Sequence, residues 1–160
     1  MKSISFCLLL CLAFIACKKE KEKPKEPTRT EMITASTWKY DNGGIDQDRN
    51  GSIDITFEAT GYVQNCALDN TGLFYTNHTG TTDEGPTKCN DTLPQTSVFN
   101  WAFSNNETLI DITGSGLFGL GGQFRINELT SAKLTLSKDS TFTFPGYPPM
   151  TVGIIVNMKH

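Results

Sequence analysis

The chain is poor in the residues that most enzyme active sites need. It has only two histidines, of which His78 lies in a polar stretch of Thr, Asn and Gly, and His160 is the last residue. The sequence shows no nucleophile–His–acid set, no second histidine for a zinc site and no phosphate-binding glycine loop before a helix. The carboxylate pair Asp83-Glu84 lies in a Thr/Gly/Pro-rich segment that is typical of a loop. Because the general acid–base groups are missing, we expect a protein that is not an enzyme.

The chain also lacks clustered positive charge in its main body. Residues 32–160 contain seven basic and thirteen acidic side chains. Contacts to phosphate backbones need clustered Lys and Arg. An acidic body of this kind therefore excludes nucleic acid as the expected partner.

No apolar run is long enough to cross a membrane. The run Ile4–Ala16 follows Lys2 and contains only Ser5 as a polar residue, whereas a spanning helix needs roughly 20 apolar residues. A short run of this kind is typical of a secretory signal peptide. Its last residues, together with Cys17, read Phe-Ile-Ala-Cys and resemble a bacterial lipobox. The resemblance implies a signal peptide over residues 1–16 and acyl chains on Cys17 that hold the protein to a membrane. Cleavage without lipidation is the alternative.

A charged segment follows the predicted lipidation site. Residues 17–29 alternate Lys and Glu with two prolines and offer no apolar cluster to bury, so this segment cannot fold alone and stays extended. We expect a tether that separates a folded domain, residues 30–160, from the membrane. The predicted location is the cell envelope, at the outer membrane, with the periplasmic and the surface side both open.

The remaining cysteines form one pair. Cys7 and Cys11 belong to the predicted signal peptide and Cys17 to the lipid anchor, which leaves Cys66 and Cys89. In an oxidising compartment an even pair predicts a disulfide. A metal-binding or redox pair is the alternative.

The body of the chain has the period of β-strands. Thr28 precedes Glu31 by three residues, as in a capping box, and predicts a short first helix with Met32, Ile33 and Ala35 on its inner face. Beyond it, apolar and polar residues alternate, which predicts half-buried strands. These stretches are Ile53–Phe57, Tyr62–Cys66, Phe99–Phe103, Leu109–Thr113, Phe124–Asn127, Lys133–Ser137 and Val152–Met158. We expect about eight to ten antiparallel strands, arranged as a barrel or a sandwich.

The order of these parts resembles the lipocalin-like lipoprotein domain common in Bacteroidota. The matching pieces are Ser36–Tyr40, Asp46–Gly51, Phe57–Tyr62, the Cys66/Cys89 pair, Asn100–Phe103, Phe124–Thr130 and Leu134–Leu136. The resemblance implies an all-β fold, an eight-stranded antiparallel up-and-down barrel with a short N-terminal helix. Such a barrel is wide enough to be filled by side chains or to hold one small ligand.

An acidic loop carries the clearest metal-binding pattern. Oxygen-bearing residues recur at alternate positions, as in the first part of an EF-hand calcium loop. They are Asp46, Asp48, Asn50, Ser52 and Asp54. The twelfth position, where that loop needs a bidentate Glu, is Phe57, and Glu58 follows it. Calcium is therefore the expected ion, if the loop holds one, and a solvated polar turn is the alternative.

Two further segments are unusually apolar for loops. Gly114–Gly122 is an apolar lip at a barrel mouth, a membrane-facing flap, or a long hairpin connection whose apolar residues fold back on the core. Phe142–Pro149 contains prolines that cannot join a β-ladder. It is expected to cap one end of the barrel or to form a recognition surface.

Together these features predict a monomeric barrel domain that binds a small apolar or amphipathic ligand. The residues expected to face that ligand are Phe99, Trp101, Phe103, Phe124 and Ile126. The alternative is a filled barrel that contacts an envelope protein or a glycan through its loops.

Overall fold

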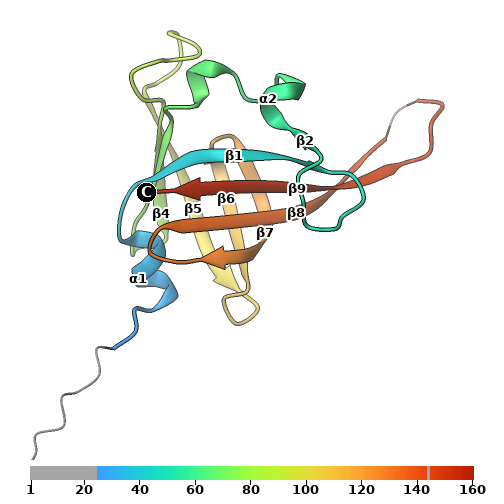
Figure 1. The fold of residues 1–160 in the computed structure, drawn as a ribbon. Helices are drawn as coiled ribbons and strands as arrows, with labels where there is room; N and C mark the ends of the chain where they lie inside the picture. Colours follow the sequence, from blue (N-terminus) through green and yellow to red (C-terminus); the bar gives the residue numbers. More distant parts are fainter. Residues whose placement is uncertain (1–24, 144) are drawn as a thin grey trace, which may run out of the picture.

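A computed structural model describes residues 25–143 and 145–160 of the chain (Figure 1). The predicted signal peptide, Cys17 and the first part of the tether lie outside these described residues. The elements, in chain order, are α1 (Arg29–Thr34), β1 (Trp38–Asp46), β2 (Ile55–Thr56), α2 (Phe57–Thr60), the 3₁₀ turn η1 (Asn65–Ala67), β3 (Thr71–Phe74), β4 (Thr79–Asp83), β5 (Thr96–Ser104), β6 (Leu109–Leu117), β7 (Leu120–Leu129), β8 (Lys133–Phe142) and β9 (Met150–Lys159). Within the described residues, no helix combines the length and the apolar character needed to cross a membrane.

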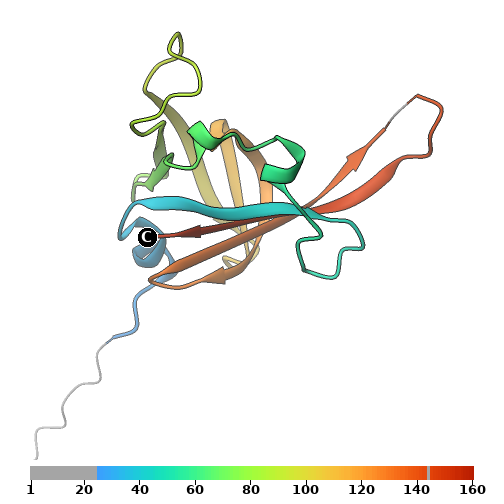
Figure 2. The ribbon, with the colours of Figure 1, turned by 45° about the horizontal axis from the view of Figure 1, so that its top comes forward.

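The strands form a closed antiparallel barrel of eight strands, as predicted. Each strand from β3 to β9 pairs with its neighbours in sequence, and β1 closes the ring because it pairs with both β9 and β3. The short β2 pairs with β1 outside this ring. Figures 1 and 2 show the curved sheet wrapping around its interior, with the β8–β9 hairpin extending beyond it.

The core lies inside the barrel and follows the alternation of the strands. On β9, Val152, Ile154, Val156 and Met158 are buried and face inward, as the sequence predicts. The same face of β8 contributes Leu134 and Leu136. Successive strand residues point to opposite faces, so every second residue of each strand faces the interior of the barrel. The barrel thus encloses its core without a second layer of helices or strands.

One end of the barrel is closed by α1. The capping box is confirmed, because Thr28 Oγ1 accepts the Glu31 N–H and the Glu31 carboxylate accepts the Thr28 N–H. Ile33 is buried, and its carbonyl accepts the indole N–H of Trp38 at 2.8 Å. The His160 ring stacks on Trp38 with 3.8 Å between centroids. Helix, first strand and C-terminus therefore close this end together.

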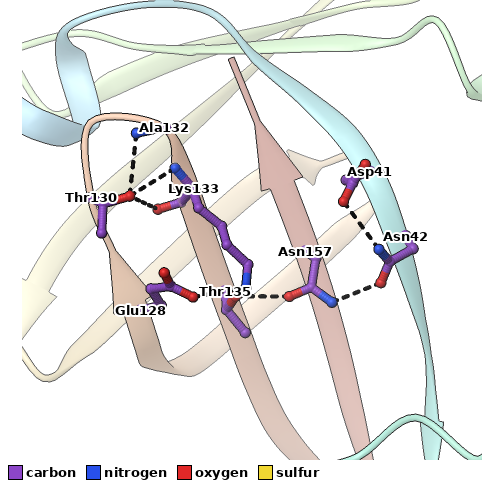
Figure 3. Close-up of polar contacts among 8 residues, drawn as sticks. All are labelled: Asp41, Asn42, Glu128, Thr130, Ala132, Lys133, Thr135 and Asn157. Carbon is purple, nitrogen blue, oxygen red and sulfur yellow. Dashed lines mark hydrogen bonds and ion pairs between the residues drawn. The ribbon is translucent and has the colours of Figure 1, made fainter.

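Polar side chains join the first and last strands on the outer face (Figure 3). Asn157 on β9 accepts the Thr135 hydroxyl of β8 at 2.7 Å and donates to Asn42 on β1 at 2.8 Å. Nearby, Lys133 pairs with Glu128 at 2.8 Å across the β7–β8 hairpin. Neutral hydrogen bonds contribute about 1 kcal/mol each, so this ladder fixes the register of the seam more than it stabilises the fold.

Two predicted strands are wrong. In the stretch Ile53–Phe57 only Ile55–Thr56 is a strand, and Phe57 begins α2. The stretch Tyr62–Cys66 contains a bend and the start of η1 instead of a strand. The alternation was misleading because Phe57 is buried by a helical turn that packs against β1.

Other predictions about the connections are confirmed. Cys66 and Cys89 form a disulfide with 5.2 Å between their Cα atoms, linking η1 to the β4–β5 connection. The segment 114–122 folds back on the core, since Leu117 is buried and Phe118 and Leu120 pack against the core. Leu120 also borders an open pocket at one end of the barrel, so this packed segment forms part of the barrel mouth as well.

Candidate functional site

The interior of the barrel is filled by aromatic side chains. Phe74 packs edge-on against Phe99 and Trp101, with 5.2 and 5.5 Å between ring centroids. The indole N–H of Trp101 donates to the carbonyls of Tyr75 and Thr79. The cavity left between β6, β7, β8 and β9 has a volume of about 10 Å³, which is about the space of one water molecule. Among the described residues, the side chains between these four strands therefore leave no room for a ligand.

The five predicted ligand-facing residues all belong to this packed region. Phe99, Trp101 and Phe124 are buried, and Phe103 and Ile126 are half-buried against the core. Their inward direction is as expected, and contact with a ligand stays a prediction. They do not line the apolar pocket described next.

An open apolar pocket of about 520 Å³ lies at the end of β1 that carries Ile45, opposite to the end where Trp38 contacts α1. It is formed where β1 ends, β9 begins, β8 leaves the barrel and α2 crosses. Its lining residues are Ile45, Phe57, Thr60, Gly61, Tyr62, Leu120, Lys138, Ser140, Phe142 and Ile154. The volume is in the range of small-molecule sites, which are mostly apolar with a few polar groups. We call this the mouth pocket.

The wall formed by α2 depends on local capping and on one glycine. Thr56 Oγ1 accepts the Ala59 N–H, and Gly61 ends the helix with a positive φ of 72°. Phe57 then lies so close to β1 that a Cβ at Gly43 would come within 2.8 Å of the Phe57 ring. Only glycine permits this approach. The wall of the pocket therefore depends on Gly43 of β1 as well as on the residues that cap α2.

A hydrogen bond between buried Tyr40 and exposed Glu58 joins β1 to α2. The Tyr40 hydroxyl donates to the Glu58 carboxylate at 2.8 Å. Burial raises the pKa of Tyr40, and the hydrogen bond to Glu58 raises it further. The neutral phenol is therefore the form that holds the α2 wall in place.

The β8–β9 hairpin leaves the mouth and points into solvent (Figure 2). Phe142 lines the mouth pocket, while Tyr147 is 74% exposed and Met150 is also exposed. The expectation that residues 142–149 cap the barrel is wrong for residues 145–149, which extend away from it (Figure 2). Phe144 lies outside the described residues.

Lys138 is the charged residue of the mouth pocket, and the sequence analysis missed it. It is half-buried, and its ammonium group donates to the Gly121 carbonyl at 2.6 Å. It also lies 4.6 Å from the centroid of the Phe124 ring, within the range of a cation–π contact. The signal was present, since continuing the Leu134, Leu136 alternation by one step places Lys138 on the inward face.

The acidic loop brings together three of its five predicted metal ligands. Carboxylate oxygens of Asp46, Asp48 and Asp54 lie within 4.8 Å of one another. Asn50 Oδ1 accepts the N–H of Ser52, and the Asn50 amide donates to Asp48. These contacts hold the loop curled with its carboxylates converging.

Asp46 is the buried member of the loop, and its environment is polar. Burial alone would raise the pKa of Asp46, but hydrogen bonds from the Gly51 and Asn50 N–H groups outweigh it and lower the pKa. Glu58 is not brought to the loop, because it bonds Tyr40 instead. The donor set thus fits the first half of a calcium loop and lacks the bidentate acid. Calcium binding stays a prediction beside the polar-turn alternative.

No protein-family model matches this chain, and no curated protein matches it. The barrel and its mouth pocket are therefore the features from which a function can be inferred.

Proposed function

We propose that this chain is an envelope-anchored, lipocalin-like lipoprotein that binds a small apolar or amphipathic ligand without catalysis. The observation that supports it is the position of the free space. The barrel interior is filled, and an apolar pocket of about 520 Å³ opens at one end. An open pocket lined by Phe57, Leu120 and Ile154 exposes apolar surface that a ligand would cover.

The test is native mass spectrometry of the purified chain, followed by a variant that fills the pocket. Ser140→Trp adds a large ring on the inward face of β8, where Ser140 lines the mouth pocket. Thr141→Trp is the matched control, because Thr141 is exposed on the outer face of the same strand. We expect a co-purifying apolar mass in the wild type and in Thr141→Trp, and its loss in Ser140→Trp. No bound mass in any variant, together with no binding of added amphiphiles, would overturn the proposal.

A second function is supported by the projecting hairpin. Phe142, Tyr147 and Met150 are exposed on one segment that extends beyond the barrel, and exposed apolar patches mark interaction sites. In this alternative the barrel is a structural body whose hairpin contacts an envelope protein or a glycan. Replacing Tyr147 with Ser would then abolish partner capture and leave amphiphile binding unchanged, whereas the ligand proposal predicts the pocket variant to be the damaging one.

The anchor is proposed from the sequence alone. A cysteine after a short apolar leader supports acylation at Cys17. Metabolic labelling with a fatty-acid analogue tests it, with Cys17→Ser as the control. Label that persists in Cys17→Ser, or its absence from the wild type, would contradict the anchor.

A further inference from the structure

The inward face of β8 changes chemistry along its length. Leu134 and Leu136 are buried in the core. The next residues on this face, Lys138, Ser140 and Phe142, all line the mouth pocket. One strand face therefore carries apolar groups in the interior, one cation at the inner edge of the pocket, and a polar and an aromatic residue toward the opening.

The Lys138 ammonium group has no carboxylate partner among the described residues. The ion pairs found in this part of the chain join Arg125 to Asp139, Lys133 to Glu128 and Lys159 to Asp41. Asp139, the adjacent acid on β8, is on the outer face and pairs with Arg125. The contacts of Lys138 are a backbone carbonyl and an aromatic ring.

A cation in this position is incompletely compensated. An ammonium group has three donors, and here one of them meets the Gly121 carbonyl. Removing a charge from water is costly unless it is paired. A ligand that covers the pocket would remove water from Lys138. With a neutral ligand the desolvation of the ammonium group would weaken binding, whereas an anionic group would offset this desolvation by pairing with the ammonium group.

We propose that the mouth pocket takes an amphiphile with a single anionic head group, a carboxylate or a phosphate, and that Lys138 binds this head. The apolar body of the amphiphile lies against Phe57, Leu120 and Ile154. This inference rests on the proposed function and adds the charge of the ligand to it. A purely structural Lys138, which only ties β8 to the Gly121 carbonyl, makes a different prediction, since it would not discriminate between head groups.

The experiment compares three ligands with the same chain length and different heads. Laurate, dodecyl phosphate and dodecanol are titrated calorimetrically, below their aggregation concentrations, into the full chain carrying Cys17→Ser. We expect both anions to bind on the order of tenfold to a hundredfold more tightly than dodecanol, as for a charge-assisted hydrogen bond. The ratio between laurate and dodecyl phosphate identifies which head is preferred.

Variants of two lysines on the same strand locate the effect. Lys138→Met keeps the length of the side chain and should reduce the binding of both anions to the level of dodecanol, with dodecanol binding nearly unchanged. Lys138→Arg should retain the preference. Lys133→Met, on the outer face of β8 where Lys133 pairs with Glu128, should leave all three affinities unchanged.

The two proposals fail in different ways. Equal binding of the three ligands by the wild type, or an anion preference that survives in Lys138→Met, overturns the inference and leaves the proposed function standing. No binding of any ligand overturns both. Should Lys138→Met fail to fold, the contrast between laurate and dodecanol in the wild type and in Lys138→Arg decides the question.

Discussion

The two ends of the barrel are built in different ways. At the closed end, α1 packs on Trp38, and the strands are joined by tight turns at residues 75–78, 105–108 and 130–132. At the mouth, the connections over residues 47–54, 84–95 and 143–149 are longer, although the β6–β7 turn at 118–119 is short, and the short α2 forms one wall of the opening. At the closed end the apolar side chains are buried against one another, whereas at the mouth some apolar side chains line an open pocket. The proposed binding site therefore lies at the end of the barrel whose apolar side chains are less completely covered.

The largest expected effect is a difference in stability between the two ends. Trp38→Ala removes a fully buried ring and its hydrogen bond to Ile33 and should lower the free energy of unfolding by about 3–5 kcal/mol. Tyr62→Ala at the mouth removes a side chain that is 60% exposed and should cost less than about 1 kcal/mol while weakening ligand binding. Urea unfolding measures both variants. Equal losses of stability would contradict the division between the ends.

The disulfide is expected to stabilise the mouth end. Cys66 and Cys89 are 23 residues apart, and their bond joins the segment after α2 to the β4–β5 connection. The double variant Cys66→Ala/Cys89→Ala should lose ~3 kcal/mol in the chain-entropy model, and faster amide exchange should be found near η1 than near α1. Protection factors lowered equally at both ends would contradict this local role.

Calcium, if the sequence-based expectation holds, should also act at the mouth end. With a dissociation constant on the order of 10⁻⁴–10⁻³ M, 10 mM Ca²⁺ should add about 1.4–2.7 kcal/mol to the free energy of unfolding. Thermal unfolding with EDTA and with Ca²⁺ measures the shift, and Asp48→Ala should remove it. The polar-turn alternative predicts the same unfolding temperature under both conditions.

The smallest expected effect is a pH dependence at Tyr40. Because the pKa of Tyr40 is raised in the folded chain, the folded state holds its proton more tightly than the unfolded state. Stability from this group is full below the ordinary tyrosine value of about 10 and is lost as the pH rises through that value toward the higher one of the folded chain. Tyr40→Phe should therefore lose less stability than the wild type above pH ~10. Parallel curves for the two proteins would show that Tyr40 is not held in its neutral form.

The alternation in the sequence was sufficient for most of the strands but left a barrel and a sandwich open, and it was insufficient for the mouth. The eight-stranded barrel was expected from the family resemblance. Strands β5 to β9 could be predicted because their apolar residues recur at every second position and face one interior. The same alternation gave a wrong strand at Phe57, because the Thr56 cap and Gly61 make this segment a short helix. The pocket itself could not be predicted, because it depends on how far β1, β8 and α2 separate. Lys138 could have been found as the charged residue on the strand face that begins with Leu134 and Leu136.

The central claim is that ligand binds at the mouth and not inside the barrel, and isoleucine methyl groups report on both places. Ile45 and Ile154 line the mouth pocket, whereas Ile33 and Ile110 are buried in the core away from it. In a methyl NMR titration with laurate, we predict shifts for Ile45 and Ile154 that saturate together, with Ile33 and Ile110 unmoved. Shifts centred on Ile33 and Ile110, or none at all, would contradict this account.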